Sequence, residues 1–188
     1  MEKWHCRFAT LRDVRDLVDL QVDCTRRLGG EFYSSLEIDG YIHEIGTLDI
    51  TLIYLRRYYV VEHQGEIVGC GGWSDRSPHY DQQLEGRRLE GGRTGMNLPK
   101  IRGFFVHPDY ARRGIGRALM EQVETEVRHA GYDSIDLTAM LSGVDFYRSL
   151  GYRIAGSTAV QLSNGAYLPT IEMVKHFREA EEGRYPDL

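Results

Sequence analysis

The stretch from Lys100 to Ala130, KIRGFFVHPDYARRGIGRALMEQVETEVRHA, decides how the rest of the chain is organised. It begins with an apolar run of β-branched and aromatic residues, Ile101 to Val106, which is typical of a buried strand. Pro108 ends that strand because proline has no N–H for a ladder. A glycine-and-arginine turn follows. Apolar residues then recur at helical spacing, at Ile115, Leu119, Val123 and Val127. The stretch therefore predicts a strand, a turn and an amphipathic helix.

The turn between that strand and that helix has the chemistry of an anion-binding site. The first N–H groups of a helix lack intrahelical acceptors, and the helix dipole places partial positive charge there. Gly114 and Gly116 leave the backbone open to a ligand. Arg112, Arg113 and Arg117 add positive charge in a chain whose net charge is −5. This combination favours a phosphate or a pyrophosphate.

Two common phosphate motifs do not fit the turn, and a third family does. A P-loop would need Gly-Lys-Ser/Thr, and a dinucleotide fingerprint would need a third glycine at Leu119. An NAD-binding redox domain is therefore a distant alternative, with Asp133 and Asp136 as its candidate ribose ligands. The residues HPDYARRGIGRALM resemble motif A of the GCN5-related N-acetyltransferases (GNAT), with consensus Arg/Gln-x-x-Gly-x-Gly/Ala. The chain departs from that consensus at Ala111, which is tolerable because the motif acts mainly through backbone amides.

A second segment carries the same resemblance. The residues LSGVDFYRSLGY, Leu141 to Tyr152, resemble motif B of the family, in which a strand and a short break precede a helix with Phe-Tyr and Leu-Gly-Phe/Tyr. The strand is expected over Ser134 to Ala139. The family often has an asparagine in the break. Here Ser142 lies in that region, where it either binds the pantetheine arm of coenzyme A or caps the helix.

The resemblance implies one N-acetyltransferase domain over residues 1–188, with a core at about 3–175 and a charged tail at 176–188. Its fold is α/β (α+β): a central mixed, mostly antiparallel sheet of about seven strands, splayed at the middle and flanked by about four helices. The remaining patterns predict strands at 4–9, 58–62, 67–73, 157–162 and 168–174, and helices at 11–27 and from Ser34 or Ser35 to Ile45. Residues 74–99 read as a long irregular connection that could cover an acceptor site.

The resemblance also implies acetyl-CoA as cosubstrate and assigns residues to it. Its pyrophosphate would lie on Arg112, Arg113, Gly114, Ile115, Gly116 and Arg117. The pantetheine arm would pair with the backbone of Phe105 and Val106. Tyr147 would protonate the departing thiolate, which a phenol of pKa ~10 can do for a thiol of pKa ~8.5. The alternative for Tyr147 is a core aromatic paired with Phe146.

The acceptor is expected to be a small-molecule amine, because the acidic balance of the chain suits a cationic acceptor. In the resembled family the first two helices form one wall of the acceptor cleft. That wall would bring Glu31 and Tyr33 to the substrate, and Trp73 would form another wall; the alternatives are surface and core positions. An amine of pKa ~10.4 needs a base. The base stays unassigned among Glu31, His43, Asp75, His79 and His107.

These assignments predict direct transfer of an acetyl group from acetyl-CoA to a primary amine in a ternary complex. No cysteine lies in a recognised nucleophile motif, so a covalent acyl-enzyme is not expected. The alternative from another class is a non-catalytic acyl-CoA-binding sensor or regulatory module.

The composition of the chain indicates which class of protein, which partners and which compartment to expect. With 41% hydrophobic and 27% charged residues the chain is typical of globular proteins. Its acidic balance does not suggest a nucleic-acid partner, and no apolar run is long enough to suggest a membrane partner. The start lacks the apolar core of a signal peptide, and three cysteines without paired spacing are typical of reduced thiols in a cytoplasmic protein. The histidines lack metal-ligand spacing, so no metal site is expected. The sequence is compatible with a homodimer.

Overall fold

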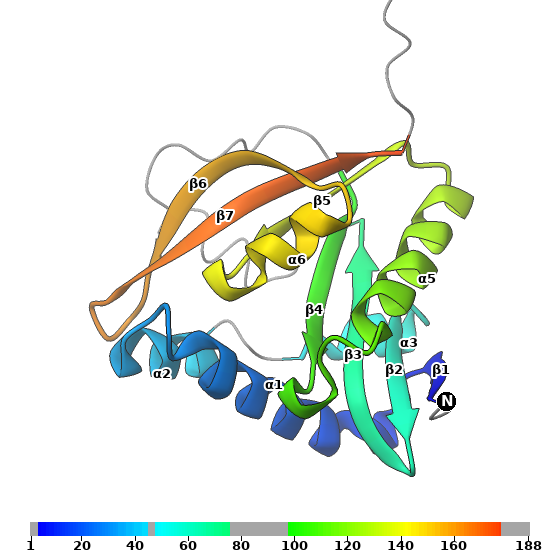
Figure 1. Cartoon of the computed structure of the whole chain (residues 1–188), viewed down its shortest axis with the longest axis horizontal. Helices are drawn as coiled ribbons and strands as arrows, with labels where there is room; N and C mark the ends of the chain where they lie inside the picture. Colours follow the sequence, from blue (N-terminus) through cyan, green and yellow to red (C-terminus); the bar gives the residue numbers. More distant parts are fainter. Residues whose placement is uncertain (1–3, 45–47, 76–97, 178–188) are drawn as a thin grey trace, which may run out of the picture.

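The computed structural model describes residues 4–44, 48–75 and 98–177 (Figure 1). The strands of this part are β1 (His5–Phe8), β2 (Tyr58–His63), β3 (Glu66–Ser74), β4 (Lys100–Val106), β5 (Ser134–Ala139), β6 (Arg153–Gln161) and β7 (Tyr167–His176). The α-helices are α1 (Val14–Gly29), α2 (Ser35–Glu44), α3 (Ile50–Tyr54), α5 (Ile115–His129) and α6 (Val144–Ser149). Three single turns of 3₁₀-helix are η1 (Leu11–Asp13), η2 (Pro108–Tyr110) and η3 (Leu141–Gly143).

The expected α/β fold is confirmed, with a seven-stranded mixed sheet in the order β1-β2-β3-β4-β5-β7-β6. Neighbouring strands are antiparallel except β4 and β5, which are parallel and share one register pair, Lys100 with Asp136. Beyond that pair the two strands diverge, so the expected splay in the middle of the sheet is present. A dinucleotide-binding domain is built on a parallel sheet. This topology therefore rules out the NAD-binding alternative.

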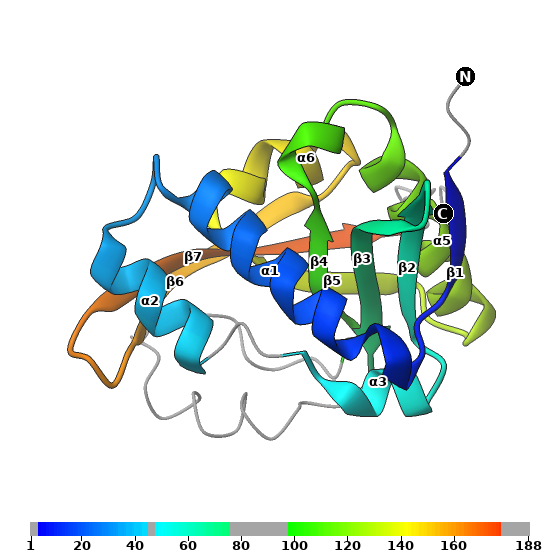
Figure 2. The same ribbon diagram turned by 90° about the horizontal axis from the view of Figure 1, so that it is seen from below.

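Helices cover both faces of the sheet (Figures 1 and 2). Figure 2 shows α1 lying across β3 and β4, with α2 and α3 on the same side. On the other face, α5 buries Val123 and Val127 in a cluster that also contains the odd-numbered β5 residues Ile135, Leu137 and Ala139. That alternation follows from the period of two in a strand. Asp136 and Thr138, the even-numbered residues between them, therefore face the side of α1.

Local sequence signals set most element boundaries. Ser34 caps α2, because its N–H donates to the Glu37 carboxylate at 2.7 Å and its hydroxyl accepts from the Glu37 N–H at 3.4 Å. Gln64 and Gly65 both have positive φ, 52° and 87°, which gives the tight β2–β3 turn.

Two elements differ from expectation. α3 was not expected; its N-cap is Asp49, whose carboxylate accepts the Thr51 N–H at 3.0 Å. Five α-helices are therefore present in the described residues instead of about four. β6 begins at Arg153, four residues before the expected start at Ser157, because it pairs with β7 along its whole length. Most of the connection expected at 74–99, at residues 76–97, and most of the tail, at 178–188, lie outside the described residues. Among the helices that are described, none is long and apolar enough to span a membrane.

Candidate active site

A cleft of about 490 Å³ lies where β4 and β5 separate. Because the strands diverge, residues from both faces of the sheet reach it. On the α5 and α6 side the lining includes Arg112, Gly116, Ser142, Phe146 and Tyr147. On the α1 and α2 side it includes Cys24, Thr25, Leu28 and Tyr41. The cleft therefore offers two approaches to one interior, one from each face.

The middle of β4 forms one wall of this cleft. Gly103, Phe104, Phe105 and Val106 all line it. The single register pair with β5 leaves the edge of β4 that faces β5 without a strand partner in the described residues beyond Lys100. Such an edge presents backbone N–H and C=O groups to an extended ligand, which can add to the sheet as a strand would. Phe105 and Val106, whose backbone is predicted to pair with the pantetheine arm, both line this part of the cleft.

The β4–α5 turn has the geometry of an anion-binding site. Arg112 has φ +63° and Gly114, the N-cap of α5, has φ +85°. Left-handed residues of this kind turn successive backbone N–H groups to one side, and the helix dipole adds to their positive potential. Gly116 faces inward: a Cβ built there would lie 3.0 Å from the Phe146 ring. Any side chain at this position would therefore enter the wall of the cleft.

The predicted anion-binding residues play different parts. Arg112 and Gly116 line the cleft, whereas Ile115 is 2% exposed and anchors α5 in the core. Arg113 is exposed, and its guanidinium lies 5.1 Å from the Tyr110 ring centroid. Arg117 is exposed on the first turn of α5. The turn therefore combines an open backbone with nearby positive charge.

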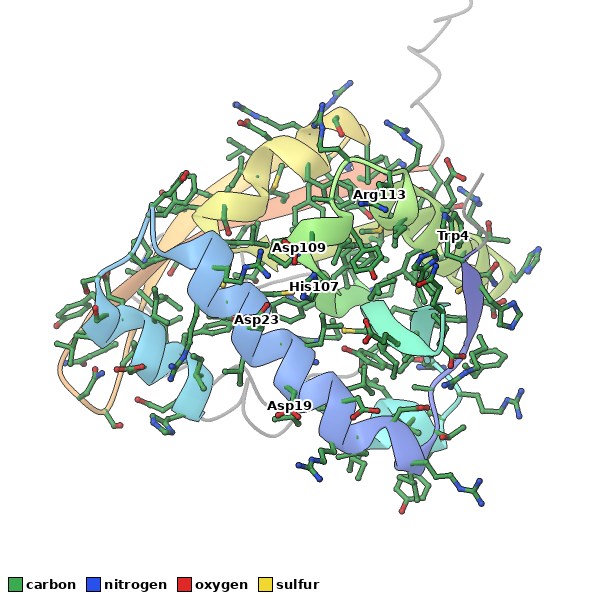
Figure 3. All side chains as sticks on the ribbon, turned by 60° about the horizontal axis from the view of Figure 1, so that its bottom comes forward. Trp4, Asp19, Asp23, His107, Asp109 and Arg113 are labelled. Atoms are coloured by element: carbon green, nitrogen blue, oxygen red, sulfur yellow. The ribbon has the colours of Figure 1, made fainter. Side chains whose placement is uncertain are left out.

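A charged cluster ties α1 to this turn (Figure 3). Arg27 of α1 donates to the Asp109 carboxylate at 2.5 Å, and this bond lowers the pKa of Asp109. Figure 3 shows His107 between Asp23 and Asp109, and its Nε2 lies 3.5 Å from the Asp23 carboxylate. His107 was one candidate for the base. It lies outside the cleft lining, beside the predicted phosphate turn.

Tyr147 of α6 lies in the wall of the cleft. It is 9% exposed, and its ring packs edge-on against Phe104, Phe146 and Tyr152 at centroid distances of 6.3, 5.2 and 5.8 Å. Burial raises its pKa. The two readings of Tyr147 are therefore compatible, since one side chain belongs to the core and also faces the cleft.

Ser142 lines the same wall without capping α6. The helix begins after Gly143 with no side-chain hydrogen bond at its N-cap, and the Asp145 side chain is 98% exposed. The structure therefore shows no capping bond from Ser142 in α6 and places this residue on the cleft. Binding of the pantetheine arm by Ser142 stays a prediction.

Cys24 also lines the cleft. Its thiol is 1% exposed and lies 3.5 Å from the Val106 carbonyl oxygen. Burial raises its pKa to about 12. Only a small fraction would be thiolate near neutral pH, and the thiolate is the nucleophilic form. This environment does not favour an acyl-cysteine.

The structure does not bring the three predicted acceptor residues to the cleft. Tyr33 is 6% exposed, and its hydroxyl donates to the Pro169 carbonyl and accepts from the Leu141 N–H, both at 2.8 Å. Trp73 is 3% exposed and lies under the Arg57 guanidinium at 4.1 Å. Glu31 is exposed and is not part of the lining. Tyr33 and Trp73 are buried in the core and do not line the cleft, because burying a large aromatic ring removes much apolar surface from water and stabilises the fold.

Sequence reasoning missed the residues that line the cleft on the α1 and α2 side. Thr25 and Leu28 are ordinary positions of an amphipathic helix, and Tyr41 repeats at core spacing in α2, so no local signal distinguishes them. Leu28 is an apolar side chain that is 41% exposed. Among the remaining base candidates, His43 and Asp75 are not in the lining, Asp75 being bound to Arg57 at 2.6 Å. His79 lies outside the described residues.

Solved structures of low sequence identity share the whole fold. A GCN5-related N-acetyltransferase from Rhodopseudomonas palustris matches with a TM-score of 0.70 at 19% identity, over 94% of this chain and 97% of its own. PaiA N-acetyltransferase from Thermoplasma acidophilum, solved with coenzyme A, matches with a TM-score of 0.65 at 13% identity, over 93% and 99%. YncA from Salmonella typhimurium, a putative acetyltransferase solved with acetyl-CoA, gives 0.59 at 15%, over 97% and 99%.

Sequence comparison points the same way. The chain is 27% identical over 143 residues to human N-acetyltransferase 8, covering 72% of this chain and 57% of that protein. It is 22% identical over 100 residues to an uncharacterized N-acetyltransferase from Chlorobaculum tepidum, covering 53% and 52%. The chain thus spans a little over half the length of these curated relatives. The model of the acetyltransferase (GNAT) domain matches residues 55–154, more than half of the sequence, and includes both motifs. The chain belongs to the GNAT acetyltransferase family.

Proposed function

We propose that this chain transfers the acetyl group of acetyl-CoA directly to a primary amine of a small-molecule acceptor, in a ternary complex. The observation that carries the proposal is one cleft that joins three parts: the open start of α5, the unpaired edge of β4, and Tyr147 in its wall. Two neighbours in fold space, from Thermoplasma acidophilum and Salmonella typhimurium, were solved with coenzyme A and acetyl-CoA respectively, which supports this choice of cosubstrate.

The residues of the cleft fit acetyl-CoA part by part. Backbone N–H groups at Ile115 to Arg117, together with Arg112, suit the pyrophosphate. The edge of β4 at Phe105 and Val106 suits the amide-containing pantetheine arm, which can hydrogen-bond as an added strand does. Bare Gly116 keeps that region of the wall free of side-chain atoms, since its Cβ position lies 3.5 Å from Val106 and 3.0 Å from Phe146.

Tyr147 supplies the acid in this scheme. As the acceptor nitrogen bonds to the acetyl carbon and the carbon–sulfur bond breaks, Tyr147 gives its phenolic proton to the sulfur. The nitrogen loses one proton to water, and a proton from water restores the phenol. The raised pKa keeps the phenol protonated before transfer. The high pKa of Cys24 supports direct attack by the amine, because this thiol is a poor nucleophile at neutral pH.

The acceptor would enter from the α1 and α2 side. Leu28, Tyr41 and Met140 line that approach with Thr25 and Thr138. This mixture of apolar surface, one phenol and two hydroxyls suits a small amine whose body is apolar or aromatic.

The proposal is tested by binding of acetyl-CoA to Gly116→Asp. The substitution places a carboxylate at the start of α5, against the proposed pyrophosphate, so calorimetry should show affinity reduced at least ~100-fold, because repulsion replaces a favourable charge interaction. Ala130→Asp is the control, because Ala130 is exposed and has a right-handed φ of −76° that an aspartate adopts without strain. It introduces the same charge beyond the other end of the same 15-residue helix, about 20 Å away, and should bind acetyl-CoA like the wild type.

Gly116→Ala shows how much of the loss of acetyl-CoA affinity comes from the bulk of a side chain at this position and how much comes from its charge. The methyl group of this variant is crowded by the Phe146 ring at 3.0 Å and meets Val106 at an ordinary contact of 3.5 Å, so the loss of affinity should be smaller than that of Gly116→Asp. Folding of all three variants is checked by circular dichroism. A folded Gly116→Asp variant with unchanged affinity for acetyl-CoA would remove the start of α5 from the cofactor site.

A further inference from the structure

β4 is kinked at the point where it enters the cleft. Between the pairs Cys70–Phe105 and Gly72–Arg102, β3 advances by two residues while β4 advances by three. Gly103 has φ +52°, a left-handed conformation that glycine adopts at little cost. β4 therefore contains a bulge with one extra residue, which bends a strand and increases its local twist.

The bulge decides which side chains face the cleft. A strand alternates its side chains, so one extra residue moves every later side chain to the opposite face. Phe104 thereby turns toward α6, where its ring stacks on Phe146 at 5.8 Å. Phe104 also covers bare Gly71, whose Cβ position would lie 2.5 Å from the ring. Without the bulge, Phe104 would point to the α1 side and the wall beside Tyr147 would be lost.

The hydroxyl of a buried tyrosine in β2 contacts the bulge of β4. Tyr58, the first residue of β2, donates to the Gly103 carbonyl oxygen at 2.6 Å. Gln21 of α1 donates to the same phenolic oxygen at 3.0 Å, and the Cys70 thiol lies 3.4 Å away. Tyr58 is 1% exposed, Gln21 3% and Cys70 0%. Water therefore has no direct access to the Gly103 carbonyl from this side.

We propose that Tyr58 is a positioning residue for acyl transfer: it fixes the β4 bulge through the Gly103 carbonyl and so holds the pantetheine-binding edge of β4 open. This role rests on the proposed function, because it requires that the edge of β4 binds the cosubstrate. The physical reason is the short hydrogen bond by which the buried Tyr58 hydroxyl fixes the direction of the Gly103 carbonyl. When the hydroxyl is removed, this carbonyl keeps the longer contact with the Cys70 thiol at 3.6 Å, and the Gln21 amide loses its acceptor, so the bulge is held less firmly.

Tyr58→Phe tests the proposal, with Tyr59→Phe as its matched control. Tyr59 is the next residue of β2, is 3% exposed, and stacks on Phe8 at 4.7 Å on the α5 face, away from β4. Both variants lose one buried phenolic oxygen. Calorimetry should give about tenfold weaker binding of coenzyme A to Tyr58→Phe and unchanged binding to Tyr59→Phe.

A comparison with the nucleotide portion of coenzyme A distinguishes this role from a general loss of structure, which would weaken the binding of both ligands. 3′-Phosphoadenosine 5′-diphosphate carries the pyrophosphate but no pantetheine, so it should bind wild type and Tyr58→Phe equally. Unchanged coenzyme A affinity in folded Tyr58→Phe would overturn the inference. Equal weakening of coenzyme A and nucleotide would overturn it as well, because the effect would then not be confined to the edge of β4.

A second variant keeps the test decisive if Tyr58→Phe does not fold. Gln21→Met keeps the side-chain volume and removes the donor to the Tyr58 oxygen, so it should weaken coenzyme A binding in the same direction, by less than Tyr58→Phe. No change in folded Gln21→Met would then count against the inference. Failure of the proposed function looks different, since the wild-type chain would itself bind neither coenzyme A nor acetyl-CoA.

Discussion

Tyr147 is the residue on which the proposed chemistry depends most. Replacement by phenylalanine keeps the ring that packs against Phe104 and Phe146 and removes only the hydroxyl. General acid catalysis typically contributes ~10² to 10⁴-fold, so kcat for Tyr147→Phe should fall within that range while the KM for acetyl-CoA changes little. The measurement is steady-state kinetics with an amine identified in an acceptor panel.

Tyr132→Phe is the control for this substitution. Tyr132 is partly buried against Trp73, with centroids 6.1 Å apart, and is not among the residues lining the cleft. Its kcat should equal that of the wild type. Near-full kcat in Tyr147→Phe would mean that another donor protonates the sulfur and that Tyr147 serves packing.

The pH dependence of the rate gives a second prediction at this residue. Burial raises the pKa of Tyr147 above that of an ordinary tyrosine, ~10. An acid is active in its protonated form, so this group is ready to donate at every pH below its raised pKa. The log of kcat/KM should therefore show no downward limb between pH 7 and about pH 9.5. A limb in that window which disappears in Tyr147→Phe would contradict the raised pKa of Tyr147, because it would show the phenol losing its proton below about pH 9.5.

Residue identity predicted the cleft residues near α5 and β4 better than those near α1 and α2. The glycines and arginines after β4 form a recognisable local pattern, because an open backbone beside positive charge is typical of an anion-binding site. The other side of the cleft is lined by residues such as Leu28 and Tyr41, whose types are common in any helix. Their role follows from where α1 and α2 cross the splayed sheet, which no short pattern encodes.

At the level of elements, a buried ion pair joins α5 to β7. Lys175 lies 2.7 and 2.9 Å from the two carboxylate oxygens of Glu124, and the Tyr152 hydroxyl donates to that carboxylate at 3.1 Å. Glu124 is 4% exposed. Lys175→Met should therefore lower the free energy of unfolding by about 3–5 kcal/mol, because a buried carboxylate would lose its cation.

Urea denaturation measures that loss. Arg148→Met provides the comparison, since Arg148 is 59% exposed and its pair with Asp145 spans 3.9 Å; such a surface pair contributes at most about 1 kcal/mol. The double variant Glu124→Gln, Lys175→Met should recover part of the stability. If Lys175→Met cost no more than Arg148→Met, the carboxylate would not depend on this cation.

The corner between β1 and η1 should make stability depend on pH. Arg7 donates to both carboxylate oxygens of Asp13 at 2.8 and 2.9 Å, and these bonds lower the pKa of Asp13 to about 2. A lowered pKa stabilises the folded state above the unfolded value of ~3.9, and this contribution is lost as pH falls through about 2. Asp13→Asn should thus cost up to about 2 kcal/mol at pH 7.

The same difference should shrink between pH 4 and pH 2, because the wild-type carboxylate becomes protonated over that interval. Denaturant unfolding of both proteins across this range measures it. A difference between wild type and Asp13→Asn that stayed constant from pH 7 to pH 2 would show that the pair does not act through charge.

Element types were largely predictable, whereas irregularities within elements were not. Apolar alternation and the turn at Gln64-Gly65 predicted β2 and β3, and helical spacing predicted α1 and α5. The bulge of β4 was not predicted, because Gly103 in an apolar run has no local mark of a left-handed residue. It arises from a contact with Tyr58, which is 45 residues away in sequence. Long-range hydrogen bonds of this kind are invisible to periodicity.

At the scale of the whole molecule, the separation of two parallel neighbours in an otherwise antiparallel sheet creates the site. α5 approaches the gap from one face and α1 from the other, so cosubstrate and acceptor can enter from opposite sides (Figures 1 and 2). Motif A predicted β4 and α5, the strand and the helix on one side of the gap. The other side of the gap depends on a strand order in which β7 lies between β5 and β6. The sequence pattern did not specify that order.

The central claim is that acetyl-CoA occupies the gap between β4 and β5. Amide hydrogen exchange with and without acetyl-CoA tests it most directly, because the claim names the backbone groups that should be covered. The account predicts slower exchange at Phe105 and Val106 and at Ile115 to Arg117 when acetyl-CoA is bound, with little change at β1 or in the β6–β7 turn. Binding that left both of those segments unprotected, or protection confined to other parts of the chain, would contradict it.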